Sequence, residues 1–452
     1  MPANQVGNPN NPLLPSSAYV GVSPPALWVI LALGFLARLA WISVVESGIT
    51  SDFVYDATLY FEAGRQIAAG EGFVTSPGVP TAYFPPGYPI ILAGFFVLFG
   101  PKFLLPALIN SVAGTATCWV TYKLGARAYG LRAGLIGAAL LAFWPSHIYA
   151  SSATMSETVF TFFLTSVIYS FYLLETSERG ERNRGWLLLG FLIGFTSLVR
   201  GAGFLFVGVM ALALLINHGL KQKAFVRLAM LLVPLLLTTG LWTLRNQITM
   251  GAPILLGTSG GWSFFNAHNE KADGGQSWVI DRYRMDLFKE NLTSQDSREN
   301  DVTLHTLQVV HAVNYMATHP MEELAQIPKR VYRMHRSDDW PLMWIGWRTR
   351  SEDDRRPSIA YVNAHIDPWL PKIANVYYFV ALGLGLSGLV LAFSRVYRRS
   401  WIIPLSVIYF HVLHGVIFFG TERFHAPFLP ELALGAGLLL TVAGRQVGKA
   451  AR

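Results

Sequence analysis

Ten apolar runs separated by polar connections constrain this chain more than any other feature of its sequence. A helix needs about 20 apolar residues to cross a bilayer, and most of these runs approach that length. Only 14% of the residues are charged, against about 25% in soluble globular domains. The chain is therefore predicted to be an all-α polytopic membrane protein of about ten transmembrane helices, near 26–45, 103–122, 133–150, 158–174, 186–199, 203–217, 227–244, 372–393, 401–419 and 426–443.

Lys and Arg are concentrated in every second connection, three at a time. Cytoplasmic connections of membrane proteins are enriched in these two residues, so the alternation predicts which connections face the cytoplasm. It places both chain termini there as well, including a polar N-terminal tail at 1–25. The basic residues are Lys123, Arg127 and Arg132; Arg179, Arg182 and Arg184; Lys221, Lys223 and Arg227; Arg395, Arg398 and Arg399; and Arg445, Lys449 and Arg452.

The first outer loop in this topology comprises residues 46–102, within a transmembrane core that extends over 26–244. Its apolar segment 86–100 is too short to cross a bilayer. Counting that segment as a span would also move the next three basic residues to the outer side. We therefore predict that it is an interfacial helix lying in the outer surface of the membrane.

A second, larger outer loop is predicted at 245–371, before the C-terminal transmembrane helices and cytoplasmic tail at 372–452. The part at 251–275 is rich in Gly, Ser and Asn, which favours an irregular binding segment. Apolar residues recur at helical spacing over 303–318, which predicts an amphipathic helix that rests on the interface.

The unusual polar residues of the chain gather on this outer side. An unpaired charge at bilayer depth is costly, so such residues are expected to line a cavity. The pattern predicts an outward-facing polar site that is capped by the outer loops. Its candidate residues are Asp52, Asp56, Tyr60, Glu157, Arg200, Arg245, Asn246, His268, Asn269, Glu422, Arg423 and His425.

Asp56 is the strongest catalytic candidate in this set. Residues 55–69 have helical spacing, which places Asp56 and Tyr60 on one face, and Asp52 is either the N-cap of that helix or a second site carboxylate. An ordinary Asp is ionised at neutral pH and can act as a general base or orient an acceptor hydroxyl.

Three outer arginines, Arg200, Arg245 and Arg423, supply the guanidinium geometry that binds phosphate or diphosphate. A carboxylate base, a phosphate clamp and an outer membrane face together indicate transfer of a group from a lipid phosphate.

Several segments, in their order along the chain, also resemble the GT-C superfamily of membrane glycosyltransferases. The resemblance is to the bacterial relatives of protein O-mannosyltransferases and of the lipid A aminoarabinose transferase in particular. They are "DATLYFEAGRQIAAGEGF" with "PTAYFPPGYPIILAGFFVLFG", "SETVF", "LVRGAGF", "LWTLRNQITMGAPI" with "GGWSFFNAHN", and "TERFHAPFLPELALGAG". The similarity extends over nearly the whole chain, although each segment alone is weakly specific.

The resemblance implies a GT-C fold, a polyprenyl-phosphate-linked sugar donor, an acceptor that enters from the extracytoplasmic side, and inversion at the anomeric carbon. The catalytic Asp of the family falls on Asp56. Two positions depart from the pattern: Ala57 stands where many relatives have Glu, and Phe84 stands where many have Lys. Any phosphate contact made by that Lys must therefore come from another residue.

Structural roles compete with these assignments. Glu157 can cap the span that it begins, Arg245 can extend its charge to the membrane surface, and Glu422 and Arg423 can pair with each other. Tyr60 is expected to pack. Supporting roles are expected for Asn246, His268, Asn269 and His425. No metal site is predicted. Relatives of the aminoarabinose transferase can bind a divalent ion, so the use of such a cofactor by this chain stays open.

The resulting hypothesis is an inverting hexosyl- or pentosyltransferase of the bacterial inner membrane, with its active site facing the periplasm. It would move a single sugar from a polyprenyl-phosphate donor to an extracytoplasmic glycan, lipid or protein, with no nucleic acid partner. A lipid-linked glycan ligase or polymerase is the main alternative, and a lipid or glycan transporter is the second. The identities of the sugar, the polyprenol and the acceptor stay open, as does the oligomeric state.

Overall fold

The protein is almost entirely helical over the residues that the computed structural model describes, which are 24–46, 56–76, 78–177, 183–292, 294, 296–342 and 367–450. The exception within these ranges is a small antiparallel hairpin in the first outer loop, formed by β1 (Val74–Ser76) and β2 (Val79–Pro80). The predicted all-α class is therefore confirmed.

Every predicted span falls on a helix. Six helices of the described part are long and apolar enough to cross a membrane: α1 (Pro25–Glu46), α4 (Leu104–Ala128), α7 (Glu157–Thr176), α11 (Gln222–Met250), α18 (Trp369–Ala392) and the segment Glu422–Val447, which contains η8 (Glu422–Phe428) and most of α20 (Leu429–Ala450). Shorter apolar helices occupy three further predicted spans: α8 (Asn183–Val199), α9 (Ala202–Leu205) with α10 (Val207–His218), and α19 (Ile402–Val412) with the π-helical turn η7 (Leu413–Ile417).

The remaining predicted span, 133–150, is bent and not straight. It consists of α5 (Leu131–Ala142) followed by α6 (Pro145–Tyr149) and η2 (Ala150–Ser152), with 58° between the two parts. A residue before proline is driven towards the extended region, and Trp144 has φ −68° and ψ 117°. The helix is therefore interrupted at Trp144, and the segment 153–156 connects the second part to the start of α7.

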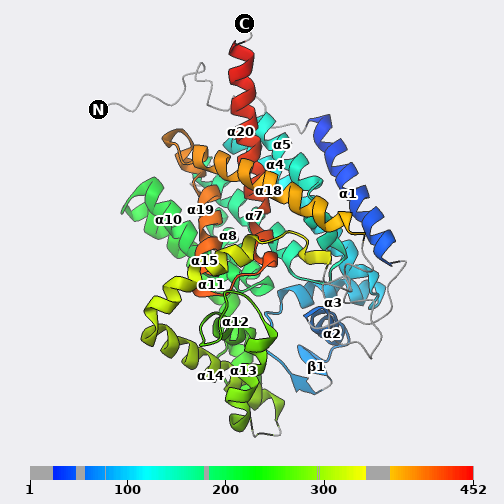
Figure 1. The fold of residues 1–452 in the computed structure, drawn as a ribbon, viewed down its shortest axis with the longest axis vertical. Helices are drawn as coiled ribbons and strands as arrows, with labels where there is room; N and C mark the ends of the chain where they lie inside the picture. The colour runs from blue at the N-terminus through cyan, green and yellow to red at the C-terminus, as the bar shows by residue number, and fades with distance from the viewer. Residues whose placement is uncertain are drawn as a thin grey trace.

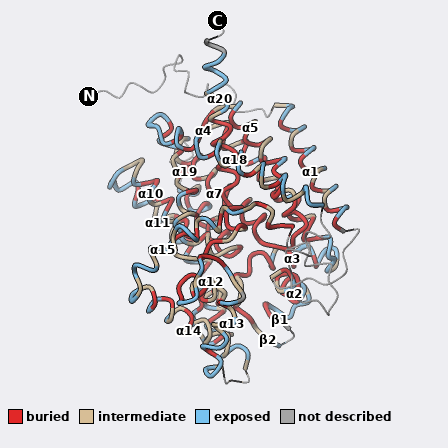
Figure 2. Tube along the Cα trace, viewed as in Figure 1, coloured by how far each residue is buried: buried red, intermediate tan, exposed pale blue. Residues whose placement is uncertain are grey.

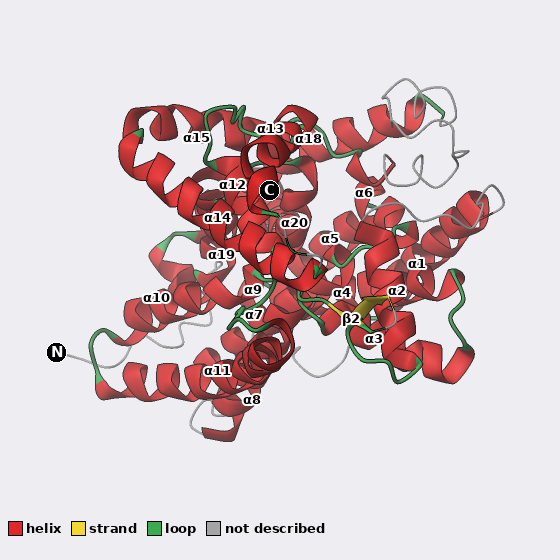
Figure 3. Cartoon of the chain, turned by 90° about the horizontal axis from the view of Figure 1, so that it is seen from below, coloured by secondary structure: helices red, strands yellow, loops and turns green. Residues whose placement is uncertain are grey.

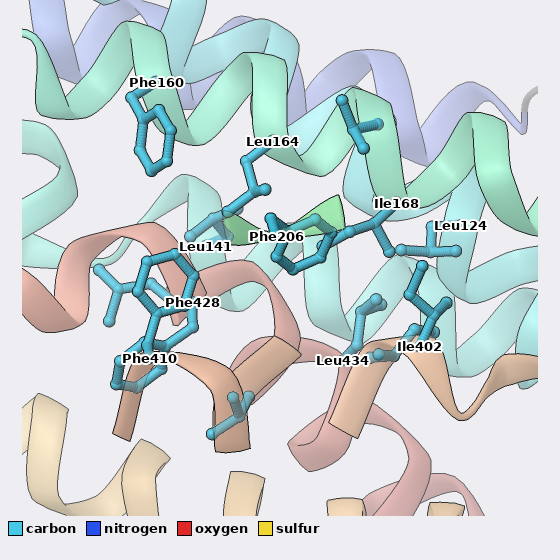
Figure 4. Packing of buried hydrophobic residues seen from close by; sticks show 14 of the residues in the cluster. Leu124, Leu141, Phe160, Leu164, Ile168, Phe206, Ile402, Phe410, Phe428 and Leu434 are labelled. Atoms are coloured by element: carbon cyan, nitrogen blue, oxygen red, sulfur yellow. The ribbon is translucent and has the colours of Figure 1, made fainter. Parts of the chain in front are cut away.

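The centre of the bundle is formed around α20, which packs against α5 and α18. A Cβ at Gly388 or Gly435 would collide with the backbone of the opposite helix, so small residues allow α18 and α20 to approach closely, as in other membrane helix pairs. Figure 2 shows the buried residues concentrated along this axis. Figure 4 shows Leu124, Ile168 and Leu434 of α4, α7 and α20 in one apolar core.

The basic connections meet at one end of this bundle. Glu175 near the end of α7 accepts hydrogen bonds from Arg227 at the start of α11 and from Asn217, at 2.9 Å, at the end of α10. Arg398 in η6 (Arg395–Ser400) donates to the carbonyl of Ile216. The C-terminal end of α20 lies far from four elements of the outer loops, which Figure 1 shows at the opposite end of the molecule: α2 (Asp56–Ala68), β1, α12 (Ser259–Ala267) and α13 (Trp278–Phe288).

The two outer loops build that opposite end. The first contains α2 (Asp56–Ala68), the hairpin and α3 (Gly87–Phe99), which correspond to the predicted helices at 55–69 and 86–100. The second contains α12 (Ser259–Ala267), α13 (Trp278–Phe288) with η4 (Lys289–Asn291), α14 (Ser297–Thr318) and α15 (Pro320–His335). In Figure 3, α12, α14 and α15 lie on one side of this face, and α2, α3 and β2 lie on the other.

The large loop is more ordered than its composition indicated. The segment 251–275, predicted to be irregular, contains α12, which packs against α14. Tertiary packing here overrides the low helix propensity of Gly and Ser. The helix predicted at 303–318 is present and begins earlier, where Asp296 caps α14 by accepting from the backbone N–H of Arg298 at 2.8 Å.

Candidate functional site

A cavity of about 710 Å³ lies between the two outer loops and the ends of the transmembrane helices. Its lining comes from α2, the segment before α3, the turn between α8 and α9, the segment 254–257, α12, α13, α14, η7 and η8. This volume falls in the range of about 300–1,000 Å³ that is typical of small-molecule sites. Asp56, Tyr60, Arg200 and Arg423 of the predicted site line it.

The charged side of the cavity is a chain of alternating acids and guanidinium groups. Arg423 Nη1 donates to Asp56 Oδ2 at 3.1 Å. Arg423 Nε lies 3.9 Å from Glu157 Oε1, and Arg200 Nη1 lies 2.7 Å from that same oxygen. Residues from distant parts of the sequence thus form one connected ionic network.

Helix geometry explains where the two acids of this network lie. Asp56 and Glu157 are the first residues of α2 and α7, respectively, where the N-terminal end of the helix dipole stabilises a negative charge. The side chain of Glu157 is only 1% exposed, and a buried carboxylate needs charged partners. Glu157 therefore holds Arg200 and Arg423 beside each other, while Asp56, at 25% exposure, faces the cavity.

Tyr60 lies one helical turn after Asp56 and supports this arrangement. Its hydroxyl is 3.3 Å from Ser156 Oγ, which also accepts from Arg200 Nη1 at 3.2 Å. Its ring stacks on Phe84, with 4.6 Å between ring centroids. Burial raises the pKa of the Tyr60 phenol, so it stays neutral and orients the hydroxyl of Ser156. Phe84, the departure from the GT-C pattern, is a packing partner of this tyrosine.

Arg245 is not brought to the cavity with the other two arginines. Its two Nη atoms donate to the carbonyls of Thr81 and Phe73, each at 2.7 Å, and Nη1 also donates to Asn246 Oδ1 at 3.1 Å. Its guanidinium lies over the ring of Trp242, 4.9 Å from the centroid. These contacts attach the β1–β2 hairpin to the end of α11, and the neighbouring Asn246 donates to the carbonyl of Ile254 at 2.8 Å.

Replacement of Arg245 with methionine should therefore destabilise the folded protein by about 2–3 kcal/mol, because two charge-assisted hydrogen bonds to the hairpin are lost. Thermal unfolding in detergent measures this, with Gln247→Ala on the exposed side of the same helix end as the control. Unchanged unfolding together with a tenfold weaker affinity for polyprenyl phosphate would instead assign Arg245 to the donor phosphate, as the sequence predicts.

The other supporting candidates lie outside the cavity lining and have partners of their own. His268 contacts Glu323 Oε2 at 2.8 Å and the carbonyl of Ile417 at 2.9 Å. Asn269 donates to the carbonyl of Phe265.

Glu422 pairs with Arg336 and not with Arg423. His425 contacts Asp338 Oδ1 at 2.6 Å and the carbonyl of Met334 at 2.7 Å. Asp52 lies outside the described residues.

The large outer loop contributes lining residues that sequence reasoning missed: Trp262, Gln276, Asp281, Arg284 and His305. Asp281 and Arg284 are spaced i, i+3 on a polar helix, a pattern that usually indicates a solvated surface pair. His414 lines the cavity from η7, a π-helical turn of the kind frequent at functional sites, but it lies within an apolar run that gave no signal.

No group of three or more His, Cys, Asp or Glu side chains is placed to hold a metal ion within the described ranges. A divalent cofactor therefore stays an expectation from the family resemblance.

Comparison with known proteins gives a family match over part of the chain. Residues 84–242 match the family described as dolichyl-phosphate-mannose-protein mannosyltransferase. This segment includes the start of α7 and Arg200. A search of curated protein sequences finds no match.

Solved structures match over most of the chain. The oligosaccharyltransferase AglB from Archaeoglobus fulgidus, in complex with an inhibitory peptide and a dolichol-phosphate, is 14% identical with a TM-score of 0.50 over 94% of this chain and 52% of that chain. An oligosaccharyltransferase from Archaeoglobus fulgidus in complex with zinc and sulfate is 16% identical, with a TM-score of 0.50 over 92% of this chain and 49% of that chain. ArnT from Cupriavidus metallidurans, bound to undecaprenyl phosphate, is 16% identical with a TM-score of 0.42 over 93% and 79%. The chain thus spans about half the length of AglB.

Proposed function

We propose that this chain, which has the GT-C fold that its sequence predicts, is an inverting glycosyltransferase that moves a single sugar from a polyprenyl-phosphate donor to an acceptor outside the cytoplasm. The observation that carries the proposal is the cavity in which Asp56, Arg200 and Arg423 meet, with Glu157 between the two guanidinium groups. A proton acceptor and a phosphate-binding pair on one wall match the needs of this transfer.

The reaction begins with the acceptor hydroxyl directed at the anomeric carbon of the sugar. Its oxygen forms a bond to that carbon while the bond from the carbon to the phosphate oxygen breaks, and the bonding electron pair leaves with the phosphate. Asp56 accepts the hydroxyl proton as general base. Attack opposite the leaving phosphate inverts the anomeric configuration.

Negative charge then accumulates on the departing lipid phosphate, where Arg423 and Arg200 stabilise it. Fixed cationic donors aimed at developing charge usually supply the largest share of catalysis. Glu157 keeps the two guanidinium groups together before the donor arrives, since both lie near the same carboxylate oxygen. The two guanidinium groups would supply the phosphate contact made by the Lys that many relatives have at the position of Phe84.

Two features support a lipid-phosphate donor and an outward-facing site. AglB, which has a similar fold, was solved with dolichol-phosphate. The elements that line the cavity lie at the end of the bundle opposite the basic connections, and the usual enrichment of Lys and Arg on the cytoplasmic side supports an extracytoplasmic cavity. The bacterial inner membrane and a glycan, lipid or protein acceptor complete the proposal.

The test uses purified protein in liposomes. The donors are polyprenyl phosphates that carry a labelled hexose or pentose, and a cell-envelope extract is the source of acceptor. Transfer of one labelled sugar with release of polyprenyl phosphate supports the proposal. Movement of a whole glycan from a lipid diphosphate would favour the ligase alternative. Passage of lipid-linked sugar across the bilayer without any glycosylated product would favour the transporter.

A further inference from the structure

The wall of the cavity that the large outer loop contributes has its own polar constellation, separate from the ionic network of Asp56. Trp262 on α12 and Asp281 and Arg284 on α13 all line the cavity. The indole Nε1 of Trp262 donates to Asp281 Oδ1 at 2.8 Å. Arg284 Nη2 lies 3.8 Å from that same oxygen. The carboxylate is thus held between an indole and a guanidinium.

This constellation is fixed in place. The ring of Trp262 packs edge-on against Phe419, with centroids 5.5 Å apart, and Phe419 is fully buried. Because Trp262 holds Asp281, the orientation of the carboxylate follows from packing between α12 and the end of the bundle. A preorganised carboxylate of this kind loses little side-chain entropy when a ligand binds.

Arg284 has a hydrogen-bond donor without an acceptor. Its Nε is buried and has no hydrogen-bond partner among the residues that the structure describes. A buried donor of this kind costs free energy unless it is satisfied, and the great majority of buried polar groups in folded proteins do have a partner. The Arg284 side chain, which lines the cavity, would satisfy this donor by turning it towards an acceptor oxygen on a ligand.

The pairing of charges selects the class of ligand. A carboxylate that accepts hydrogen bonds and a guanidinium that donates them, a few ångströms apart, complement adjacent hydroxyl groups, which donate and accept in turn. Because Asp281 and Arg284 carry opposite charges 3.8 Å apart, they offset each other and give little net attraction for an anionic or a cationic group. A neutral polyhydroxylated ring fits both, and the indole adds apolar surface for its carbon face.

The constellation is also close to the proposed reaction centre. Asp281 and Arg284 line the same cavity as Asp56 and Tyr83. A sugar ring bound at Asp281 therefore lies in the same cavity as Asp56, the proposed general base.

We propose that Trp262, Asp281 and Arg284 form a sugar-recognition subsite that binds adjacent hydroxyl groups of a neutral hexose or pentose ring. This assignment rests on the function proposed above and specifies its substrate class. The ring belongs either to the donor or to the acceptor, and the two sources separate in the experiment.

The experiment measures binding to the full-length protein in nanodiscs by tryptophan fluorescence, with three probes: polyprenyl phosphate, polyprenyl-phosphate hexose, and methyl hexosides added with polyprenyl phosphate. Asp281→Asn and Arg284→Gln are compared with Asp286→Asn and Arg282→Gln, which make the same changes at exposed positions of α13. A subsite for the donor sugar predicts that the wild-type protein binds the hexosylated lipid at least tenfold more tightly than the bare lipid phosphate. The subsite variants would lose that preference.

A subsite for the acceptor sugar predicts a different result, in which the variants bind methyl hexosides at least tenfold more weakly and keep the lipid preference. Wild-type binding of every probe by both subsite variants, as by the two controls, would overturn the subsite. If Arg284→Gln does not fold, Arg284→Lys gives the same comparison, because lysine has no Nε–H in that position. Failure of the wild-type protein to bind bare polyprenyl phosphate would instead contradict the proposed function.

Discussion

Asp56→Asn should lower the rate of sugar transfer by at least about 100-fold, because general-base catalysis typically contributes 10²–10⁴-fold. Asparagine has the same shape and keeps an oxygen that can accept from Arg423, so the fold and the ionic network should persist. The expected loss is in kcat, measured from initial rates at saturating lipid donor, while the affinity for polyprenyl phosphate changes by no more than a few-fold.

Glu62→Gln is the matched control for this substitution. Glu62 lies on the same helix as Asp56 but outside the cavity lining, where it pairs with Arg65, and its replacement should leave turnover close to that of the wild-type protein. Asp52→Asn, measured beside them, tests the predicted second carboxylate. Near wild-type turnover of Asp56→Asn would remove Asp56 from the mechanism, and a large loss in Asp52→Asn alone would transfer its role to Asp52.

Arg423→Gln should reduce kcat/KM by about 100–1,000-fold, the usual effect of removing a donor that stabilises developing negative charge. Arg423 pairs with both Asp56 and Glu157, so its loss also removes a cationic partner from two carboxylates. Arg423→Lys keeps the positive charge without the two-pronged geometry and should recover part of the activity. The measurement is steady-state kinetics with varied lipid donor.

Arg298→Gln serves as the control for a lost guanidinium, because Arg298 pairs with Asp296 on the exposed surface of the outer loop. Arg200→Gln should change kcat/KM in the same direction as Arg423→Gln, since both groups share Glu157. If Arg423→Gln is folded and fully active while Arg200→Gln is inactive, the phosphate is held by Arg200 alone and the two-arginine clamp is wrong.

The spans could be predicted from the sequence because the length of an apolar run is a local property. The bend after α5 could not, since Pro145 gives a boundary signal but no angle. Likewise, α12 forms in a Gly-rich segment because α14 packs against it, and this contact joins residues that no local pattern connects.

The candidate site could be predicted in part for a related reason. Asp56, Glu157, Arg200 and Arg423 are charged residues next to apolar runs, where a charge is costly unless it is paired or faces a cavity. Arg245 has the same sequence signature, yet its guanidinium binds carbonyls of a hairpin about 170 residues earlier in the chain. Asp281 and Arg284 were missed because an acid and a base on a polar helix are common, and only the packing of α12 and α13 makes them part of a cavity.

The ion pair between Asp56 and Arg423 has a consequence for the order of substrate addition under the proposed mechanism. While Arg423 Nη1 donates to Asp56 Oδ2, that carboxylate oxygen is engaged by the guanidinium and not by an acceptor hydroxyl. Arrival of the lipid phosphate would attract the guanidinium and free the base only once the donor is in place. Without a bound donor, the enzyme would then keep the Asp56 carboxylate paired with Arg423. The substrates would bind in a fixed order, the lipid donor first and the acceptor second.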